Sequence, residues 1–165
     1  AIDKGADEID LVFPYTAYIA GDVDACIDQI SQVRDACRPP VLLKVIIETG
    51  KLKEEAAIYS ASRLAIDCGA DFIKTSTGKV EVNATPQVAE IMLQAISDSA
   101  KSVGFKPAGG IKTVEDAANY LSIASSIMGE GWATPQTLRF GASGVLTNLL
   151  AALEGEETQE QVDGY

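Results

Sequence analysis

The sequence contains no histidine among its 165 residues. This absence excludes Ser-His and Cys-His nucleophiles, histidine metal ligands and histidine general bases in one step. Any chemistry that the chain performs must therefore come from lysine, carboxylate, tyrosine, hydroxyl or backbone groups.

Cysteine is scarce, and long apolar runs are missing. The three cysteines, Cys26, Cys37 and Cys68, lack Cys-x-x-Cys spacing, which argues against a disulfide framework and a zinc site. No apolar run approaches the roughly 20 residues of a membrane span, and no basic segment followed by an apolar one indicates a signal peptide. We therefore expect a cytoplasmic protein without a membrane partner.

Basic residues are also few, since 13 lysines and arginines stand against 24 acids and give a net charge of −11. Nonspecific nucleic-acid binding needs a basic surface to neutralise phosphates, so we expect no nucleic-acid partner. Five of the acids and no base lie in residues 154–165, which we predict to be an acidic, mobile C-terminal tail. Residues 1–153 are predicted to form one domain.

A repeat organises this domain. Strand-like runs begin near residues 8, 41, 71, 103 and 138, and a segment with helical periodicity follows each of them. Asp22, Thr85 and Thr113 stand where helix N-caps are expected, and one helix is predicted over about 52–68. A strand and a helix repeated five times suit two folds: a doubly wound open sheet, or part of a (β/α)₈ barrel that lacks about three upstream units.

Charged residues interrupt the predicted strands at matching places. GADEID at 5–10 aligns with GADFIK at 69–74, so that Asp10 and Lys74 correspond. Because side chains alternate along a strand, Asp10, Lys44, Lys74 and Lys106 are predicted to project to one interior from similar depths. One interpretation is a buried ion pair that only fixes the core. The other is that neighbouring ammonium groups and partial burial lower the pKa of one amine and make it a nucleophile for carbonyls.

Glycine-rich turns follow the later strands. Gly109 and Gly110 end the fourth strand, and GASG at 141–144 ends the fifth. Each could be an ordinary turn, since glycine is the default turn residue. Two such turns on consecutive strands, beside Thr77, Gly78 and Lys79, favour a phosphate site built from backbone N–H groups.

Four motifs, VLLKVIIETG, DFIKTSTGK, VGFKPAGG and RFGAS, resemble in their order and spacing the deoxyribose-phosphate aldolase family. The resemblance covers nearly all of this chain but about the last two thirds of a complete enzyme. It implies an α/β fold, namely five consecutive βα units of a (β/α)₈ TIM barrel whose first three units have no counterpart here. With five strands the barrel is not closed, so a homo-oligomer or completion of the barrel by another chain stays open.

The resemblance also implies an activity and its residues. A class I aldolase of this kind reversibly cleaves 2-deoxy-D-ribose 5-phosphate to acetaldehyde and D-glyceraldehyde 3-phosphate through a lysine Schiff base. It needs no cofactor and no metal, because the iminium is the electron sink. The implied catalytic residues are Lys74 as the Schiff-base lysine, Lys106 as the neighbour that perturbs it, Asp10 as the proton-relay acid, and the C-terminal Tyr165. The residues assigned to substrate and phosphate binding are Lys44, Thr77, Gly78, Lys79, Gly109, Gly110, Gly141, Ser143 and Gly144, the last standing where many relatives have a second serine.

Two other functions remain open from the sequence. The first is a truncated, noncatalytic relative that keeps the motifs without assembling the pocket. The second is a receiver-type signalling domain, which also has five βα units and a Lys-Pro after a late strand, here Lys106 and Pro107. That domain needs a phosphoacceptor aspartate at the third strand, where this chain has Lys74.

Overall fold

A computed structural model describes residues 1–154 of the chain. Four strands, β1 (Glu8–Val12), β2 (Leu42–Ile46), β3 (Phe72–Lys74) and β4 (Gly104–Lys106), form one parallel sheet in the order β1-β2-β3-β4. This order follows the chain without a reversal. A doubly wound sheet requires a reversal, so the fold is part of a (β/α)₈ barrel, as the sequence predicted.

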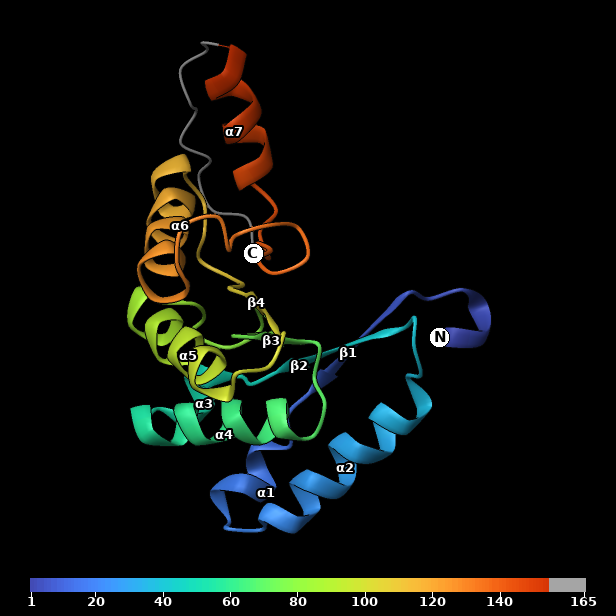
Figure 1. Cartoon of the computed structure of the whole chain (residues 1–165). Helices are drawn as coiled ribbons and strands as arrows, with labels where there is room; N and C mark the ends of the chain where they lie inside the picture. Colours follow the sequence, from blue (N-terminus) through green and yellow to red (C-terminus); the bar gives the residue numbers. More distant parts are fainter. Residues whose placement is uncertain (155–165) are drawn as a thin grey trace.

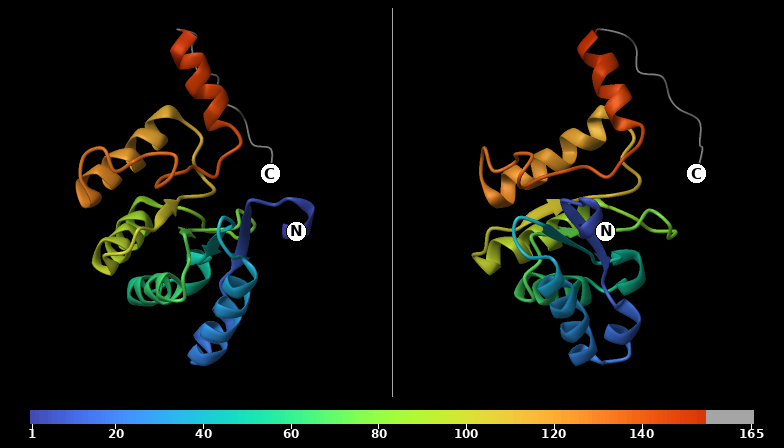
Figure 2. Two further views of the ribbon diagram at one scale, coloured as in Figure 1. Left: turned by 45° about the vertical axis from the view of Figure 1, so that its right-hand side comes forward. Right: turned by 90° about the vertical axis from the view of Figure 1, so that its right-hand side faces the viewer.

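The helices surround the outer side of this sheet. The main ones are α2 (Val23–Ala36), α4 (Glu55–Asp67), α5 (Pro86–Ser99), α6 (Val114–Met128) and α7 (Val145–Glu154), with short segments η1 (Ile2–Lys4), α1 (Tyr15–Ile19) and α3 (Thr49–Leu52). Figure 1 shows the long helices in chain order along an arc, with α7 at one end. In both views of Figure 2, α7 projects away from the sheet.

The core lies between the sheet and this arc of helices. Alternate residues of β2, Leu43 and Val45, point outward and are fully buried, as are Ile73 of β3 and Phe105 of β4. They pack against Ile30, Ile66, Met92, Leu93 and Ile96 of the helices. Because side chains alternate along a strand, the residues between them face the opposite side, which is the barrel interior.

Three predicted helix starts are confirmed. The side chains of Asp22, Thr85 and Thr113 accept hydrogen bonds from the N–H groups of Ala25, Val88 and Asp116. The helix predicted over about 52–68 is confirmed as α4, although α4 begins only at Glu55. Leu52 instead ends the short helix α3, because Lys53 has a φ of 64° that no helix can continue. The short helix α1 was not predicted.

The predicted fifth strand is only partly formed. Its residues lie parallel to β4 but are joined to it by isolated bridges, Phe105 with Leu138 and Ala108 with Gly141. The N–H of Phe105 donates to Thr137, Arg139 donates to Phe105, and Gly141 donates to Pro107. The bond that should come between them needs an N–H at Pro107, and proline has none. The ladder is therefore interrupted at Pro107.

Two further predictions concern the ends of the domain and the membrane. The boundary between a domain ending at residue 153 and an acidic tail stays a prediction, because residues 155–165 lie outside the described part.

None of the helices within residues 1–154 has the length and apolar character that crossing a bilayer requires.

Candidate active site

The four charged residues singled out in the strands lie together on the inner face of the sheet. The parallel register pairs Asp10 with Lys44 and Lys74 with Lys106, while Lys74 lies opposite Ile46, two residues beyond Lys44. Asp10 and Lys44 thus form one level of the interior, and Lys74 and Lys106 form the next level toward the carboxyl ends of the strands. The sequence predicted the shared face but not this step between levels.

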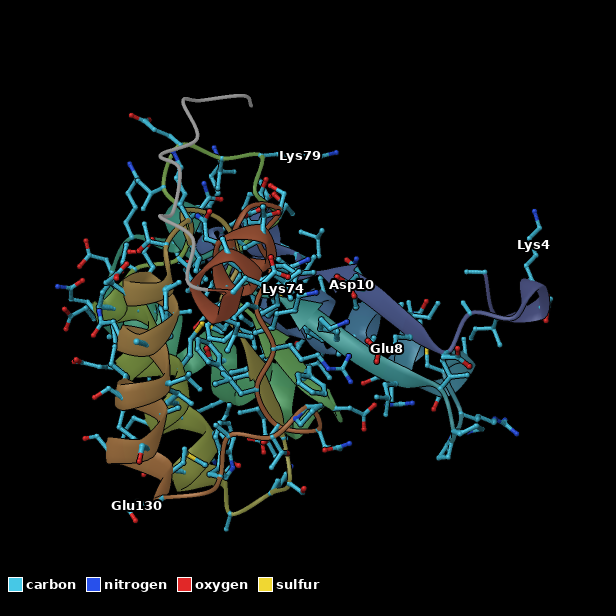
Figure 3. All side chains as sticks on the ribbon, turned by 90° about the horizontal axis from the view of Figure 1, so that it is seen from above. Lys4, Glu8, Asp10, Lys74, Lys79 and Glu130 are labelled. Atoms are coloured by element: carbon cyan, nitrogen blue, oxygen red, sulfur yellow. The ribbon has the colours of Figure 1, made fainter. Side chains whose placement is uncertain are left out.

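Asp10 joins the two levels. Its Oδ1 accepts a hydrogen bond from Lys44 Nζ at 2.8 Å, and its Oδ2 accepts one from Lys74 Nζ at 2.9 Å. Figure 3 shows Asp10 and Lys74 side by side, with Glu8 farther back along β1. Burial alone would raise the pKa of Asp10, but the hydrogen bonds from Lys44 and Lys74 outweigh it and lower the pKa. Asp10 is therefore held as a carboxylate.

Lys44 is the most enclosed of the charged groups. Its side chain is 4% exposed, and Nζ donates to Asp10 and, at 2.9 Å, to Glu8 Oε2. Burial would lower the pKa of Lys44, yet the hydrogen bonds to Asp10 and Glu8 raise it. This ammonium has two carboxylate partners and almost no contact with solvent, so the geometry favours holding Asp10 over meeting a substrate phosphate.

Lys106 differs from the other two lysines. Within residues 1–154 its ammonium forms no hydrogen bond and no ion pair. Burial and the positive charges of Lys44 and Lys74 lower the pKa of Lys106, against the opposing effect of Asp10. Of the amines on this face, Lys106 is the one whose surroundings favour the neutral form.

Two site residues, Glu8 and Arg139, were not identified from the sequence. Arg139 Nη1 donates to Glu8 Oε2 at 2.7 Å, and its guanidinium lies 4.5 Å from the centroid of the Phe72 ring. A signal for Glu8 was present, since it stands two residues before Asp10 on the same strand and must share its face. Arg139 opens the RFGAS motif, but its contact with Glu8 could not be predicted, because the two residues are 131 positions apart in sequence.

A third overlooked residue is Glu48, which follows β2. It is 3% exposed and has a left-handed backbone, with φ 56° and ψ 54°. Its carboxylate accepts hydrogen bonds from the N–H of Thr77 at 3.1 Å and from the Thr77 hydroxyl at 2.6 Å. Both donors of Thr77 are thus bound to Glu48, and Thr77 Oγ1 accepts from the N–H of Lys79. Thr77 therefore shapes the loop that begins after Lys74.

The predicted phosphate residues lie in three loops at the carboxyl ends of the strands. In the first, Gly78 and Lys79 are exposed, and Lys79 points away from Lys74 in Figure 3. In the other two, the N–H of Gly109 donates to Gly141, and that of Gly141 donates to Pro107, so these two donors are already used. Among the described residues, no acceptor contacts the backbone N–H groups of Gly110, Ser143 and Gly144.

Two glycines bring these loops together. A Cβ on Gly141 would lie 2.6 Å from the Cβ of Ala108, and a Cβ on Gly109 would lie 2.7 Å from that of Asn83. Gly109 also has a φ of +81°, which side chains rarely adopt. Both positions therefore allow a close backbone approach.

The predicted catalytic residue Tyr165 lies outside the described residues. A groove of about 700 Å³ lies on the outer side, between α4, α5 and α6, lined by residues such as Glu55, Tyr59, Glu90 and Ile123. It is remote from the lysines of the inner face. The inner face, with its amines and carboxylates in contact, is the candidate active site.

Comparison with known proteins concerns the family and the fold of the chain. The profile of a family described as DeoC/LacD family aldolase matches residues 1–149. The chain is 62% identical to a deoxyribose-phosphate aldolase of Agrobacterium fabrum (strain C58) over 165 residues, which are 100% of this chain and 64% of that protein. It therefore spans less than two thirds of this relative.

Solved structures agree with the fold. A candidate deoxyribose-phosphate aldolase from Coccidioides immitis has a TM-score of 0.78 at 28% identity, covering 93% of this chain and 55% of that one. The apo form of a candidate deoxyribose-phosphate aldolase from Toxoplasma gondii ME49 has a TM-score of 0.83 at 24% identity, covering 94% of this chain and 63% of that one. At this identity the second likeness concerns the fold alone.

Proposed function

The chain belongs to the DeoC/LacD aldolase family, and from this premise we propose that it supplies the active site of a class I aldolase. The proposed reaction is the reversible cleavage of 2-deoxy-D-ribose 5-phosphate to acetaldehyde and D-glyceraldehyde 3-phosphate through a Schiff base on Lys74. The single observation that supports it best is the contact of Lys74 with Asp10 at 2.9 Å, beside Lys106, whose amine has no polar partner within residues 1–154. Because the three side chains share one face, this arrangement supports the proposed roles of nucleophile, acid-base group and proton acceptor.

Lys106 provides a way to free the Lys74 amine. An ammonium cannot attack a carbonyl, so Lys74 must first lose a proton. The register places Lys106 directly opposite Lys74, and the lowered pKa of Lys106 makes available its neutral form, the form that can accept that proton. Transfer leaves Lys74 as an amine and Lys106 as an ammonium, with the charge of the site unchanged.

The Schiff base then follows by ordinary steps. The Lys74 amine adds to the aldehyde carbon of acetaldehyde, and loss of water gives an iminium. Removal of a proton from the neighbouring carbon, relayed by Asp10, moves the C–H electron pair into the C=C bond of an enamine. The enamine attacks the aldehyde carbon of D-glyceraldehyde 3-phosphate, and hydrolysis of the new iminium releases the sugar and restores Lys74.

The phosphate is proposed to bind where the strand ends leave backbone donors without an acceptor. Gly110, Ser143 and Gly144 supply such donors in the described part of the chain, and the last two precede the ten-residue helix α7, whose N-terminal dipole favours an anion. Gly78 and the exposed Lys79 belong to the neighbouring loop. Gly109 and Gly141 contribute through the close approach of their backbones, and Lys44 through its hold on Asp10.

Borohydride trapping tests the proposal. The chain is incubated with acetaldehyde and borohydride, which reduces an iminium to a stable secondary amine, and peptide mass spectrometry locates the added ethyl group. We expect it on Lys74, and we expect Lys74→Arg to abolish it while the matched variant Lys101→Arg, at an exposed outer lysine, retains it. An adduct on Lys106 would exchange the roles of the two lysines, and no adduct at all would favour the noncatalytic relative.

A further inference from the structure

A series of charged contacts crosses the inner face and passes through Asp10 to Lys74. Arg139 Nη1 donates to Glu8 Oε2 at 2.7 Å, Lys44 Nζ donates to the same oxygen at 2.9 Å, and Lys44 also donates to Asp10 Oδ1 at 2.8 Å. Asp10 Oδ2 then meets Lys74 at 2.9 Å. The charges alternate in sign along this series, so the three inner groups, Glu8, Lys44 and Asp10, are each held from both sides.

This series of contacts fixes the orientation of the Asp10 carboxylate. Its Oδ1 is fixed by Lys44, which leaves Oδ2 for Lys74. Lys44 in turn is 4% exposed and cannot follow a displaced Asp10 without leaving Glu8. Glu8 is the one carboxylate besides Asp10 that contacts Lys44 within residues 1–154, so it sets where the ammonium sits.

We propose that Glu8, anchored by Arg139, is a positioning residue that holds Lys44 and through it orients Asp10 toward Lys74 for proton removal from the iminium. This inference rests on the proposed function. It also joins two parts of the site, because Arg139 precedes the GASG loop, where the phosphate is proposed to bind. A displaced Asp10 slows the proton step more than it slows attack by the amine.

The charged groups that face Asp10 come from every neighbouring element. They are Glu8 on its own strand, Lys44 on β2, Lys74 on β3 and Lys106 on β4, with Arg139 reaching it only through Glu8. Glu8→Gln removes one negative charge from this set but keeps the size of the side chain. Glu8→Asp keeps the charge but shortens the reach, so the two variants separate position from charge.

Two readouts distinguish the steps. Borohydride trapping of acetaldehyde reports formation of the iminium on Lys74. Exchange of the acetaldehyde methyl protons for deuterium in D₂O reports removal of the proton, because only the enamine can take up deuterium. For Glu8→Gln we expect exchange to slow by about 10- to 100-fold while trapping changes by less than about threefold. Glu8→Asp should slow exchange as well, though less.

The matched control is Asp67→Asn, which also removes one negative charge, from an exposed pair with Lys101 on the outer surface. It should leave both readouts unchanged. Equal slowing of trapping and exchange by Glu8→Gln, or rates like those of Asp67→Asn, would overturn the positioning role. If Glu8→Gln does not fold, Arg139→Met frees Glu8 from its other partner and is judged by the same two rates.

A structural readout keeps the inference separate from the proposed function. If the unaltered chain forms no trapped iminium, the proposed function fails. The positioning role is then judged on the crystal structure of Glu8→Gln, where Asp10 should move out of hydrogen-bond distance of Lys74. An unmoved Asp10 would refute it.

Discussion

Replacing Lys44 by methionine tests the series of charged contacts on the inner face at its central residue. Methionine has a similar length and no charge, so Lys44→Met removes the cation that Glu8 and Asp10 share. Breaking a fully buried pair costs about 3–5 kcal/mol. The partners here are 30% and 37% exposed and keep Arg139 and Lys74 as neighbours, so screening reduces the expected loss to about 2–3 kcal/mol at pH 7.

The pH dependence of this loss follows from the directions of the pKa shifts. Contacts that include Lys44 lower the pKa of Glu8 and Asp10, so their contribution to stability is present above the unfolded values near about 4 and disappears as pH falls through the folded values. The pKa of Lys44 is raised above its ordinary 10.5, so its contribution is lost only as pH rises beyond that value. The difference in the free energy of unfolding between the unaltered protein and Lys44→Met should therefore be largest between pH values of about 4 and 10.5.

Urea denaturation followed by circular dichroism, repeated from pH 3 upward, measures this difference. The matched control is Lys101→Met, which removes a lysine whose ion pair with Asp67 is about half exposed. It should cost less than about 1 kcal/mol, as exposed pairs do. If Lys44→Met costs no more than this control, or the same amount at pH 3 and pH 7, then Lys44 does not hold the two carboxylates as described.

Two further predictions concern the neighbouring lysine and the glycine loops. Lys106→Leu removes the proposed proton acceptor, so that Lys74 must lose its proton to solvent and the midpoint of the pH profile for imine trapping should rise by about one unit or more. An unchanged profile would exclude Lys106 from that role. Gly141→Ala would bring a methyl group within 2.6 Å of the Cβ of Ala108 and should cost about 1–3 kcal/mol in urea denaturation, whereas stability equal to that of the unaltered chain would show that the loops can separate.

The sequence predicted the elements whose causes are local. The strand runs, the caps at Asp22, Thr85 and Thr113, and the shared face of the charged residues all follow from side-chain chemistry within a few positions. Composition could not choose between an open doubly wound sheet and a barrel. The strand order settles that choice, and it depends on pairings between residues about 30 positions apart.

The features that the sequence did not predict depend on contacts between residues that are far apart in the sequence. The interruption at Pro107 became visible only once the segment near Leu138 was known to lie beside β4. Glu48 looked like an ordinary acid after a strand, and only its burial and its two hydrogen bonds to Thr77 show that it fixes the next loop. The sequence could not show that Glu8 and Asp10 both contact Lys44, and the role of Lys44 in substrate binding stays a prediction.

The charges of the chain help to explain how an acidic protein could select a small anion. The net charge is −11, yet the inner face gathers three cations, Lys44, Lys74 and Arg139, around two carboxylates. The acidic surface would repel a polyanion. The few cations lie on the inner face of the sheet, where the many charges of a polyanion cannot reach them. The proposed substrate, a small phosphorylated aldehyde, would direct its single anionic group to the backbone donors at the strand ends that have no acceptor within residues 1–154. Lys44, Lys74 and Arg139 also favour the neutral form of the Lys106 amine, so the proposed binding and the proposed chemistry depend on one arrangement of charge.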